Sequence, residues 1–321
     1  MNGMKQINLQ DYGLNRNFIT QSMEYHDLYL ARIISQEKNF YQAVCVNGVL
    51  FAEVSGKLRF EATIQSDFPT VGDFVMLDRC NNKNGNAIIH HVLHRKSLFV
   101  RKAAGKVNEE QVVAANIDIV FLCMSLNKDF NIHRLERYLS LTWESGAIPV
   151  VVLTKSDLCD NVHRKLQVVN SIALGVDVVV TSFIEPDGYK QISKYIKPGC
   201  TVALLGSSGV GKSSLINCLM GGEFLNTKEI RIDDDKGRHA TTRRELFLIS
   251  GGGIVIDTPG MRELGMWDVS EGLDKSFADI EAYFGKCHFR NCTHTSEPGC
   301  AIWEAIAHQE LSPKRWESYR R

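Results

Sequence analysis

The chain has 321 residues, the length of about two domains with room for a small third. Lys and Arg together number 37, as do Asp and Glu, so the net charge is zero and any contact with nucleic-acid phosphates must come from local clusters of cations. With 44% hydrophobic and 23% charged residues, the composition is that of a globular protein and excludes disorder over most of the chain.

The N-terminal part indicates neither a secretion signal nor a membrane anchor. Residues 1–21 carry polar side chains at every second or third position, without the apolar core of a signal peptide. The longest apolar run, residues 117–126, is interrupted by Asp118 and is shorter than the roughly 18 residues that a membrane helix needs. We therefore expect a cytoplasmic protein that does not bind a membrane, and residues 1–27 form an extension that fits no motif.

Six of the nine cysteines are scattered without regular spacing, and the other three lie together near the C-terminus. The scattered ones are Cys45, Cys80, Cys123, Cys159, Cys200 and Cys218. In a reducing compartment they are expected to be small buried side chains, and disulfide bonds are not expected.

The first predicted unit is a small antiparallel barrel or sandwich. Short runs that alternate apolar and polar residues are separated by Asn-Gly, Ser-Gly and Val-Gly-Asp turns. The predicted strands are residues 28–34, 40–46, 49–54, 58–64, 74–77 and 87–92.

Residues 79–108, the basic stretch, contain seven Lys or Arg, three His and no Asp or Glu. The basic residues are Arg79, Lys83, Arg95, Lys96, Arg101, Lys102, Lys106, His90, His91 and His94. This cluster at the end of the barrel favours RNA binding, with Phe99 as a candidate to stack on a base, although a solvated basic hairpin would have the same composition.

Farther along the chain, predicted strands alternate with predicted helices. The strands are residues 117–124, 150–153, 176–180, 200–205 and 253–256, and the helices are 132–144, 162–174 and 212–220. This alternation predicts an α/β unit with a parallel sheet covered on both faces.

A phosphate-binding loop follows the strand at 200–205. It consists of Gly206, Ser207, Ser208, Gly209, Val210, Gly211, Lys212 and Ser213, with Ser214 next in the helix. The glycines allow backbone amides to face a phosphate, Lys212 would reach the β and γ phosphates, and Ser213 would bind Mg²⁺. A Gly/Ser turn before an ordinary helix is the alternative interpretation.

Asp257 and Gly260 lie at the end of another predicted strand. The Asp257 carboxylate can hold Mg²⁺ through a water, and the Gly260 amide can donate to a γ-phosphate oxygen. Alone, this Asp-x-x-Gly pattern is weak, because such turns are common at strand ends.

Two further strand ends supply residues that could recognise a base. They are Thr154, Lys155, Ser156 and Asp157 after one strand, and Thr181 and Ser182 after the next. The Asp157 carboxylate can accept both N–H donors on the edge of guanine, whereas adenine would present it with a lone pair, a mismatch of about 1 to 3 kcal/mol. The Lys155 stem can cover the base, and a backbone amide at 181–182 can donate to guanine O6.

These base-reading segments precede the phosphate loop, the reverse of their order in a standard small GTPase, which indicates a circularly permuted GTPase domain. In this order the motifs resemble the RsgA family, also called YjeQ, of GTPases that depend on the small ribosomal subunit. The resemblance extends from about residue 28 to the end. It implies an OB-fold barrel at 28–108, a permuted GTPase domain at 109–269 and a small helical zinc domain at 270–321.

The resemblance also suggests the groups that act in hydrolysis. Met261 stands where many GTPases have a glutamine that orients water, so His239 is the candidate for that role, although a loop histidine is as often a surface group or an RNA contact. Thr241, or else Thr242, would close over Mg²⁺. Lys212 completes the predicted catalytic set.

Cys287, Cys292, His294 and Cys300 are spaced as Cys-x4-Cys-x-His-x5-Cys. Three thiolates and one imidazole complete a tetrahedral Zn²⁺ shell without an open position, so we predict one structural zinc. The spacing matches the zinc motif of the RsgA family. His288 is the alternative imidazole ligand.

The sequence thus predicts a monomeric cytoplasmic GTPase with GTP or GDP, Mg²⁺ and Zn²⁺ as its cofactors. Its expected partners are the small (30S) ribosomal subunit and 16S rRNA, and it would hydrolyse GTP during late subunit maturation, stimulated by the subunit. A GTP-binding rRNA chaperone or checkpoint factor with little hydrolysis is the alternative. An ATPase or kinase is disfavoured by Asp157.

Overall fold

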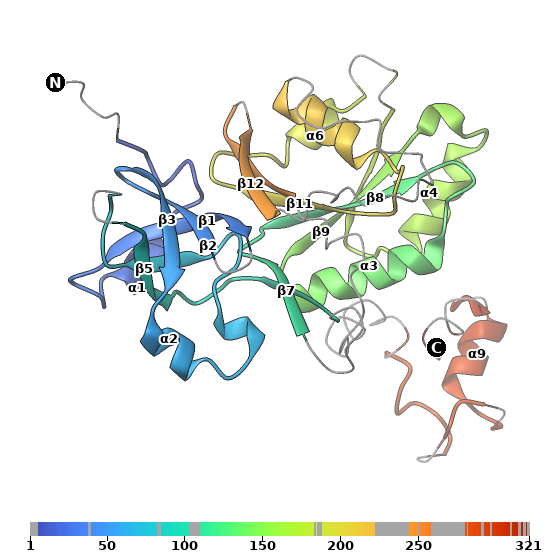
Figure 1. Cartoon of the computed structure of the whole chain (residues 1–321). Coiled ribbons are helices and arrows are strands. Elements are labelled where there is room, and N and C mark those ends of the chain that lie inside the picture. The colour runs from blue at the N-terminus through green and yellow to red at the C-terminus, as the bar shows by residue number, and fades with distance from the viewer. Residues whose placement is uncertain are drawn as a thin grey trace, which may run out of the picture.

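The computed structural model has a barrel, an α/β sheet and a small C-terminal unit (Figure 1). It describes residues 6–37, 40–81, 85–102, 110–182, 184, 188–221, 244–249, 251–257, 280, 282–289, 292–295, 297–308, 310–313, 316 and 319. No helix in these ranges is both long enough and apolar enough to cross a bilayer.

Five strands of the described N-terminal part form the barrel. They are β1 (Tyr29–Glu37), β2 (Phe40–Cys45), β3 (Gly48–Val54), β4 (Phe74–Leu77) and β5 (Ala87–Val92). β1 pairs antiparallel with both β2 and β4, which closes the sheet on itself. The interior is filled by small and branched side chains such as Ile33, Leu50 and Ile89. The helix α1 (Arg16–Ser22) packs Phe18 against Phe74, with ring centroids 4.2 Å apart.

The strand predicted at 58–64 is wrong, because the structure has the helix α2 (Gly56–Glu61) there. The Ser55 hydroxyl caps this helix by accepting a bond from the Leu58 amide at 3.0 Å. Leu58 of α2 is partly buried and packs against the barrel core, although it does not belong to a strand. β5 pairs directly with β3, so the barrel closes without a strand from this segment. These two strands are parallel, so the prediction of an antiparallel barrel is wrong for this one pair. The 3₁₀ turn η1 (Gln65–Asp67) follows.

The expectation that the scattered cysteines form no disulfide is also wrong, because Cys45 and Cys80 are joined in the barrel. Cys45 ends β2 and Cys80 lies in the loop after β4. Closure of the barrel brings their Cα atoms to 6.2 Å although they are 35 residues apart. Sequence spacing contains no signal for a pair that only barrel closure brings together.

The strands of the α/β unit lie in the order β10-β9-β8-β11-β13-β12 and are parallel except for β12. Its strands are β8 (Ile119–Ser125), β9 (Ile148–Thr154), β10 (Asp177–Val180), β11 (Thr201–Leu205), β12 (Arg244–Ile249) and β13 (Gly253–Asp257). The accompanying helices are α3 (Ile132–Ser145), η2 (Ser156–Leu158), α4 (Val162–Asn170), α5 (Lys190–Ser193) and α6 (Lys212–Met220). The core around Leu135 of α3 and the core around Leu215 of α6 are separate clusters on opposite faces (Figure 1).

The barrel and the α/β sheet are joined edge to edge. β1 pairs with β12 at Ser35–Glu245 and Gln36–Arg244, so one continuous sheet runs through both (Figure 1). A separate hairpin, β6 (Leu98–Lys102) and β7 (Glu110–Ala115), connects the barrel to β8.

The C-terminal unit has a small core of its own. The helix α9 (Ala301–Ala307) contributes Ile302 and Ala305, which pack with Ile280, Leu311 and Trp316. This core is far smaller than those of the α/β sheet, so such a unit needs a further source of stability.

Candidate functional site

The predicted phosphate loop lies between the central strand β11 and the helix α6. At Gly206 an added Cβ would lie 2.5 Å from the Cys123 carbonyl oxygen, so no side chain fits there. Gly211 precedes α6 with a φ of 105°, which favours glycine. The Lys212 ammonium donates to the carbonyls of Gly206 at 2.6 Å and Ser207 at 2.5 Å. It therefore lies at the opening of the loop, where a phosphate would be bound.

The first base-reading segment contacts the phosphate loop directly. The Thr154 hydroxyl, at the end of β9, donates to the Val210 carbonyl at 2.6 Å. Lys155 has a left-handed backbone, with a φ of 58°, and its ammonium donates to the Gly209 carbonyl at 2.7 Å. Residues more than 50 positions apart therefore form one wall of the site.

The second base-reading segment fixes the carboxylate that the sequence assigns to guanine. The buried Ser182 hydroxyl donates to Asp157 Oδ1 at 2.5 Å, while Asp157 itself is exposed. The Thr181 amide donates to the Leu153 carbonyl at 2.8 Å, which continues the pairing of β10 with β9. The carboxylate is thus held at the same sheet edge as the phosphate loop.

Asp257 ends β13, the strand beside β11, and is half-buried. Ser213 and Ser214 lie in the first turn of α6 and are half-buried. Ser156 begins η2 next to Asp157, and Ser208 is exposed in the phosphate loop. The remaining predicted residues, which are His239, Thr241, Thr242, Gly260 and Met261, lie outside the described residues.

Sequence reasoning missed Asp129, which also contacts the phosphate loop. It lies between β8 and α3 and accepts a hydrogen bond from the Ser207 hydroxyl at 2.6 Å. Bonds from Arg134 and then from Ser207 lower the pKa of Asp129. The available signal was its position just after a parallel strand, because the carboxyl ends of parallel strands meet at one edge.

The four predicted zinc ligands come together in the C-terminal unit. The ligand atoms of Cys287, Cys292, His294 and Cys300 all lie within 4.8 Å of one another. His294 Nδ1 is 3.4 Å from the sulfurs of Cys287 and Cys300 and 3.5 Å from that of Cys292. His288, the alternative ligand, is exposed and does not belong to this group.

The surroundings of the cluster fit a bound Zn²⁺. The Ala301 amide donates to the Cys287 sulfur at 3.4 Å, a contact that stabilises a thiolate. The Phe284 ring stacks on His294 with centroids 5.1 Å apart, which orients the imidazole. Three sulfurs and one nitrogen at these separations match the ligand set of a closed tetrahedral zinc site.

Several cations of the basic stretch are engaged within the fold. Arg95 pairs with the fully buried Asp73 at 2.7 Å and donates to the carbonyls of Ser66 and Phe68. Arg79 pairs with Asp78 at 2.6 Å, and Lys96 pairs with Asp118. These three cations are therefore less available to phosphates than composition alone suggests.

The predicted stacking role of Phe99 is wrong, because its ring is only 2% exposed and belongs to the core of the α/β unit. The alternation of β6 turns this side chain inward, and a base could reach it only by opening the core.

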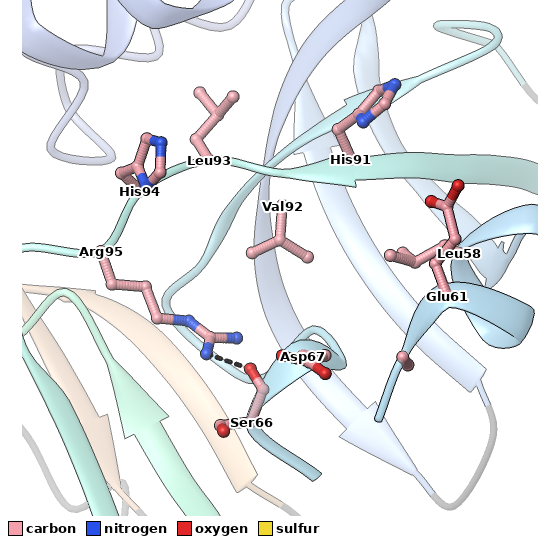
Figure 2. A pocket seen from close by; sticks show the side chains of 10 residues that line it. Leu58, Glu61, Ser66, Asp67, His91, Val92, Leu93, His94 and Arg95 are labelled. Atoms are coloured by element: carbon pink, nitrogen blue, oxygen red, sulfur yellow. Dashed lines mark hydrogen bonds between the residues drawn. The ribbon is translucent and has the colours of Figure 1, made fainter. Parts of the chain in front are cut away.

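Part of the basic stretch lines an open cleft of about 460 Å³, which lies between α2 on one side and the end of β5 with the segment that follows it on the other (Figure 2). His91, His94 and Arg95 line it, together with the acidic side chains of Glu61 and Asp67. The cleft therefore presents both basic and acidic side chains, and the apolar Leu58, Ala62, Val92 and Leu93 also line it.

Comparison with known proteins agrees with this arrangement. The family model described as RsgA GTPase matches residues 92–267. The chain is 44% identical over 315 residues to small ribosomal subunit biogenesis GTPase RsgA 2 of Lactiplantibacillus plantarum, an alignment covering 98% of this chain and 88% of the relative.

Two solved structures are similar over nearly the whole chain. YjeQ from Thermotoga maritima is 26% identical with a TM-score of 0.64, over 91% of this chain and 96% of that one. YloQ, a circularly permuted GTPase, is 25% identical with a TM-score of 0.62, over 92% of this chain and 93% of that one. The resemblance inferred from the order of the motifs and the permuted fold are thus confirmed, and the chain belongs to the RsgA GTPase family.

Proposed function

We propose that this protein hydrolyses GTP to GDP and phosphate while it assists the late maturation of the small (30S) ribosomal subunit. The observation that carries the proposal is the contact of Thr154 and Lys155 with the phosphate loop. Two motifs that are distant in the chain thus lie side by side, as a guanine-nucleotide site requires. The names of the relatives, as small ribosomal subunit biogenesis GTPases, support the choice of partner.

Within this proposed site, each group would have its own task. The amides of residues 206–211, together with Lys212, Ser213 and Ser214, would bind the phosphates, and Asp157 would accept the two donors of guanine. Ser213 and Asp257 would hold Mg²⁺, directly and through a water. The proposal also includes three residues with further roles. Thr241 would be another magnesium ligand, Gly260 would contact the γ-phosphate, and His239 would orient water.

We further propose that the barrel contacts 16S rRNA through the basic stretch, where the imidazoles of His91 and His94 can form hydrogen bonds with RNA. The protein would act in the cytoplasm as a monomer, divided at 27/28, 108/109 and 269/270. The Cys/His cluster would hold one structural Zn²⁺.

The test is GTP turnover by the purified protein with and without isolated small ribosomal subunits. We expect the subunits to increase phosphate release, because their binding would place the group that orients the attacking water. A protein that binds GTP but releases phosphate equally slowly in both cases would instead support an rRNA chaperone with little hydrolysis.

Base selection is tested by Asp157→Asn. An amide presents a donor where guanine also presents donors, so we expect about tenfold weaker GTP binding and a shift towards xanthosine triphosphate. Asp160→Asn, an exposed carboxylate three residues farther along, is the matched control. Unchanged GTP affinity in Asp157→Asn would refute the assignment of Asp157 to the base.

A further inference from the structure

Asp129 lies beside the phosphate loop without belonging to any of the motifs that define the nucleotide site. Its Oδ2 accepts the hydrogen bond from the Ser207 hydroxyl at 2.6 Å. The carbonyl of the same Ser207 accepts a bond from Lys212. One loop residue is therefore held from outside by a carboxylate and from inside by the lysine that would bind the phosphates.

Arg134, in the first turn of α3, binds the same carboxylate with both arms of its guanidinium. Its Nη1 donates to Asp129 Oδ2 at 3.0 Å and its Nη2 donates to Oδ1 at 3.2 Å. Bidentate pairing fixes the orientation of a carboxylate as well as its distance. The side chains are 23% exposed for Arg134 and 43% exposed for Asp129, so the pair is partly shielded from water.

This arrangement has an electrostatic consequence for a polyphosphate. Asp129 is ionised at neutral pH, because its hydrogen bonds lower its pKa. A negative charge next to the phosphate loop repels nucleotide phosphates unless a cation neutralises it. Arg134 supplies that cation while leaving the carboxylate free to accept the bond from Ser207.

We propose that Asp129 is a positioning residue that fixes Ser207 and the first half of the phosphate loop, and that Arg134 neutralises this carboxylate so that a nucleotide triphosphate can bind. The inference rests on the proposed guanine-nucleotide site and deepens it. It assigns to the loop after β8 a part in nucleotide affinity that none of the motifs in the sequence indicates.

A purely structural role is the competing explanation. The Asn131 side chain caps α3 by accepting a bond from the Arg134 amide at 3.0 Å, so the Asp129–Arg134 pair could serve only to begin this helix. Such a role would change the stability of the protein without any dependence on nucleotide charge. The two explanations therefore differ in how GTP and GDP affinities respond to the removal of each charge.

The experiment measures GTP and GDP dissociation constants for the full chain by calorimetry. Asp129→Ala and Ser207→Ala are each expected to weaken GTP binding about fivefold to tenfold, since each removes the same charge-assisted bond at a partly exposed site. The double variant should bind GTP no more weakly than Asp129→Ala. This non-additivity would place both residues in one interaction.

The charge argument is tested with Arg134→Ala, which leaves Asp129 unpaired. It should weaken GTP binding more than Asp129→Ala does, and it should weaken GTP more than GDP, which carries one charge fewer. Adding Asp129→Ala to Arg134→Ala should restore GTP affinity to the level of Asp129→Ala. Arg134→Lys should recover part of the loss, and Arg137→Ala, an exposed arginine on the same helix, is the matched control.

Each remaining outcome decides against the inference. The inference is overturned if Arg134→Ala binds GTP as tightly as the unaltered protein does. It is also overturned if the double variant Asp129→Ala/Arg134→Ala binds GTP more weakly than Arg134→Ala alone. If Arg134→Ala does not fold, Arg134→Gln takes its place, because it keeps a donor of similar reach without the charge. No GTP uptake by the unaltered protein would remove the proposed function together with this inference, whereas normal uptake with unresponsive variants would remove the inference alone.

Discussion

Replacing Arg32 by Met tests how the barrel is joined to the α/β unit. Arg32 lies on β1, is 1% exposed, and its guanidinium donates to the carbonyls of Gly72, Tyr12 and Asn116 and to the Thr201 hydroxyl. These partners belong to the barrel, the N-terminal segment and the α/β unit. Burial lowers the pKa of Arg32 to about 10, so the group remains charged at pH 7.

The expected loss of stability follows from the acceptors that Arg32→Met would leave behind. Gly72 keeps a second donor, the Asn116 side-chain amide at 3.1 Å, whereas the carbonyls of Tyr12 and Asn116 lose the Arg32 bond. Each buried carbonyl without its donor costs about 1 to 3 kcal/mol. The variant no longer buries a charge, and this offsets part of the lost stability. We therefore expect the free energy of unfolding to fall by about 2 to 4 kcal/mol in total.

The assay is urea unfolding followed by circular dichroism, with Arg16→Met as the control. Arg16 is exposed on α1, so its replacement should change the free energy of unfolding by less than about 0.5 kcal/mol. Amide exchange should also accelerate in residues 9–14, which adjoin the Tyr12 carbonyl. A loss below about 1 kcal/mol for Arg32→Met, without faster exchange, would show that these hydrogen bonds do not hold the junction.

Three further predictions concern the metal cluster, the disulfide and the phosphate loop. Chelating zinc should unfold the C-terminal unit while the barrel and α/β sheet remain folded, because the small core of the C-terminal unit depends on the metal. The test is limited proteolysis after chelation, which should cut only that unit. Replacing Cys45 and Cys80 by Ala should lower the free energy of unfolding by about 4 kcal/mol, because the bridge closes a loop between residues that are 35 positions apart. Dithiothreitol should lower the free energy of unfolding of the unaltered protein by the same amount. No effect of the reductant would show that the bridge does not form in solution. Gly206→Ala should weaken GTP binding by about tenfold or more, because its Cβ would displace the loop from the Cys123 carbonyl; unchanged affinity in calorimetry would contradict the close approach seen at Gly206.

Sequence reasoning succeeded where one short segment contains the whole signal. The residues of the phosphate loop follow one another in the chain, and the four zinc ligands lie within one short segment. The spacing of the glycines and of the ligands therefore predicted the local geometry that the structure has. Thr154 and Lys155 were predicted to follow a strand directly, but sequence reasoning did not derive which segment they contact. The ends of parallel strands share one edge of the sheet, which brings both residues to the phosphate loop across a wide sequence separation.

The errors arise where an interaction depends on the closed three-dimensional structure. Residues 58–64 alternate like a strand, yet the Ser55 cap and the direct pairing of β3 with β5 make the segment begin as a helix. Phe99 stands in a basic segment, but its position on β6 points it into the core. Ser207 lies in the phosphate loop, but Asp129 is 78 residues away and belongs to no motif that relates it to this loop.

The barrel adjoins the strand at one edge of the α/β sheet. In this chain β12 lies at the edge of the α/β sheet and is antiparallel to β13, which ends at Asp257. Because β1 pairs with β12, the barrel is hydrogen-bonded to the strand beside the proposed magnesium-binding residue. The register of β1 on β12 can change only by whole residues. A smaller displacement of β12 must therefore either break its pairing with β1 or move the barrel with it. Arg32 joins the same two units through buried hydrogen bonds, which add to the free energy needed to separate them.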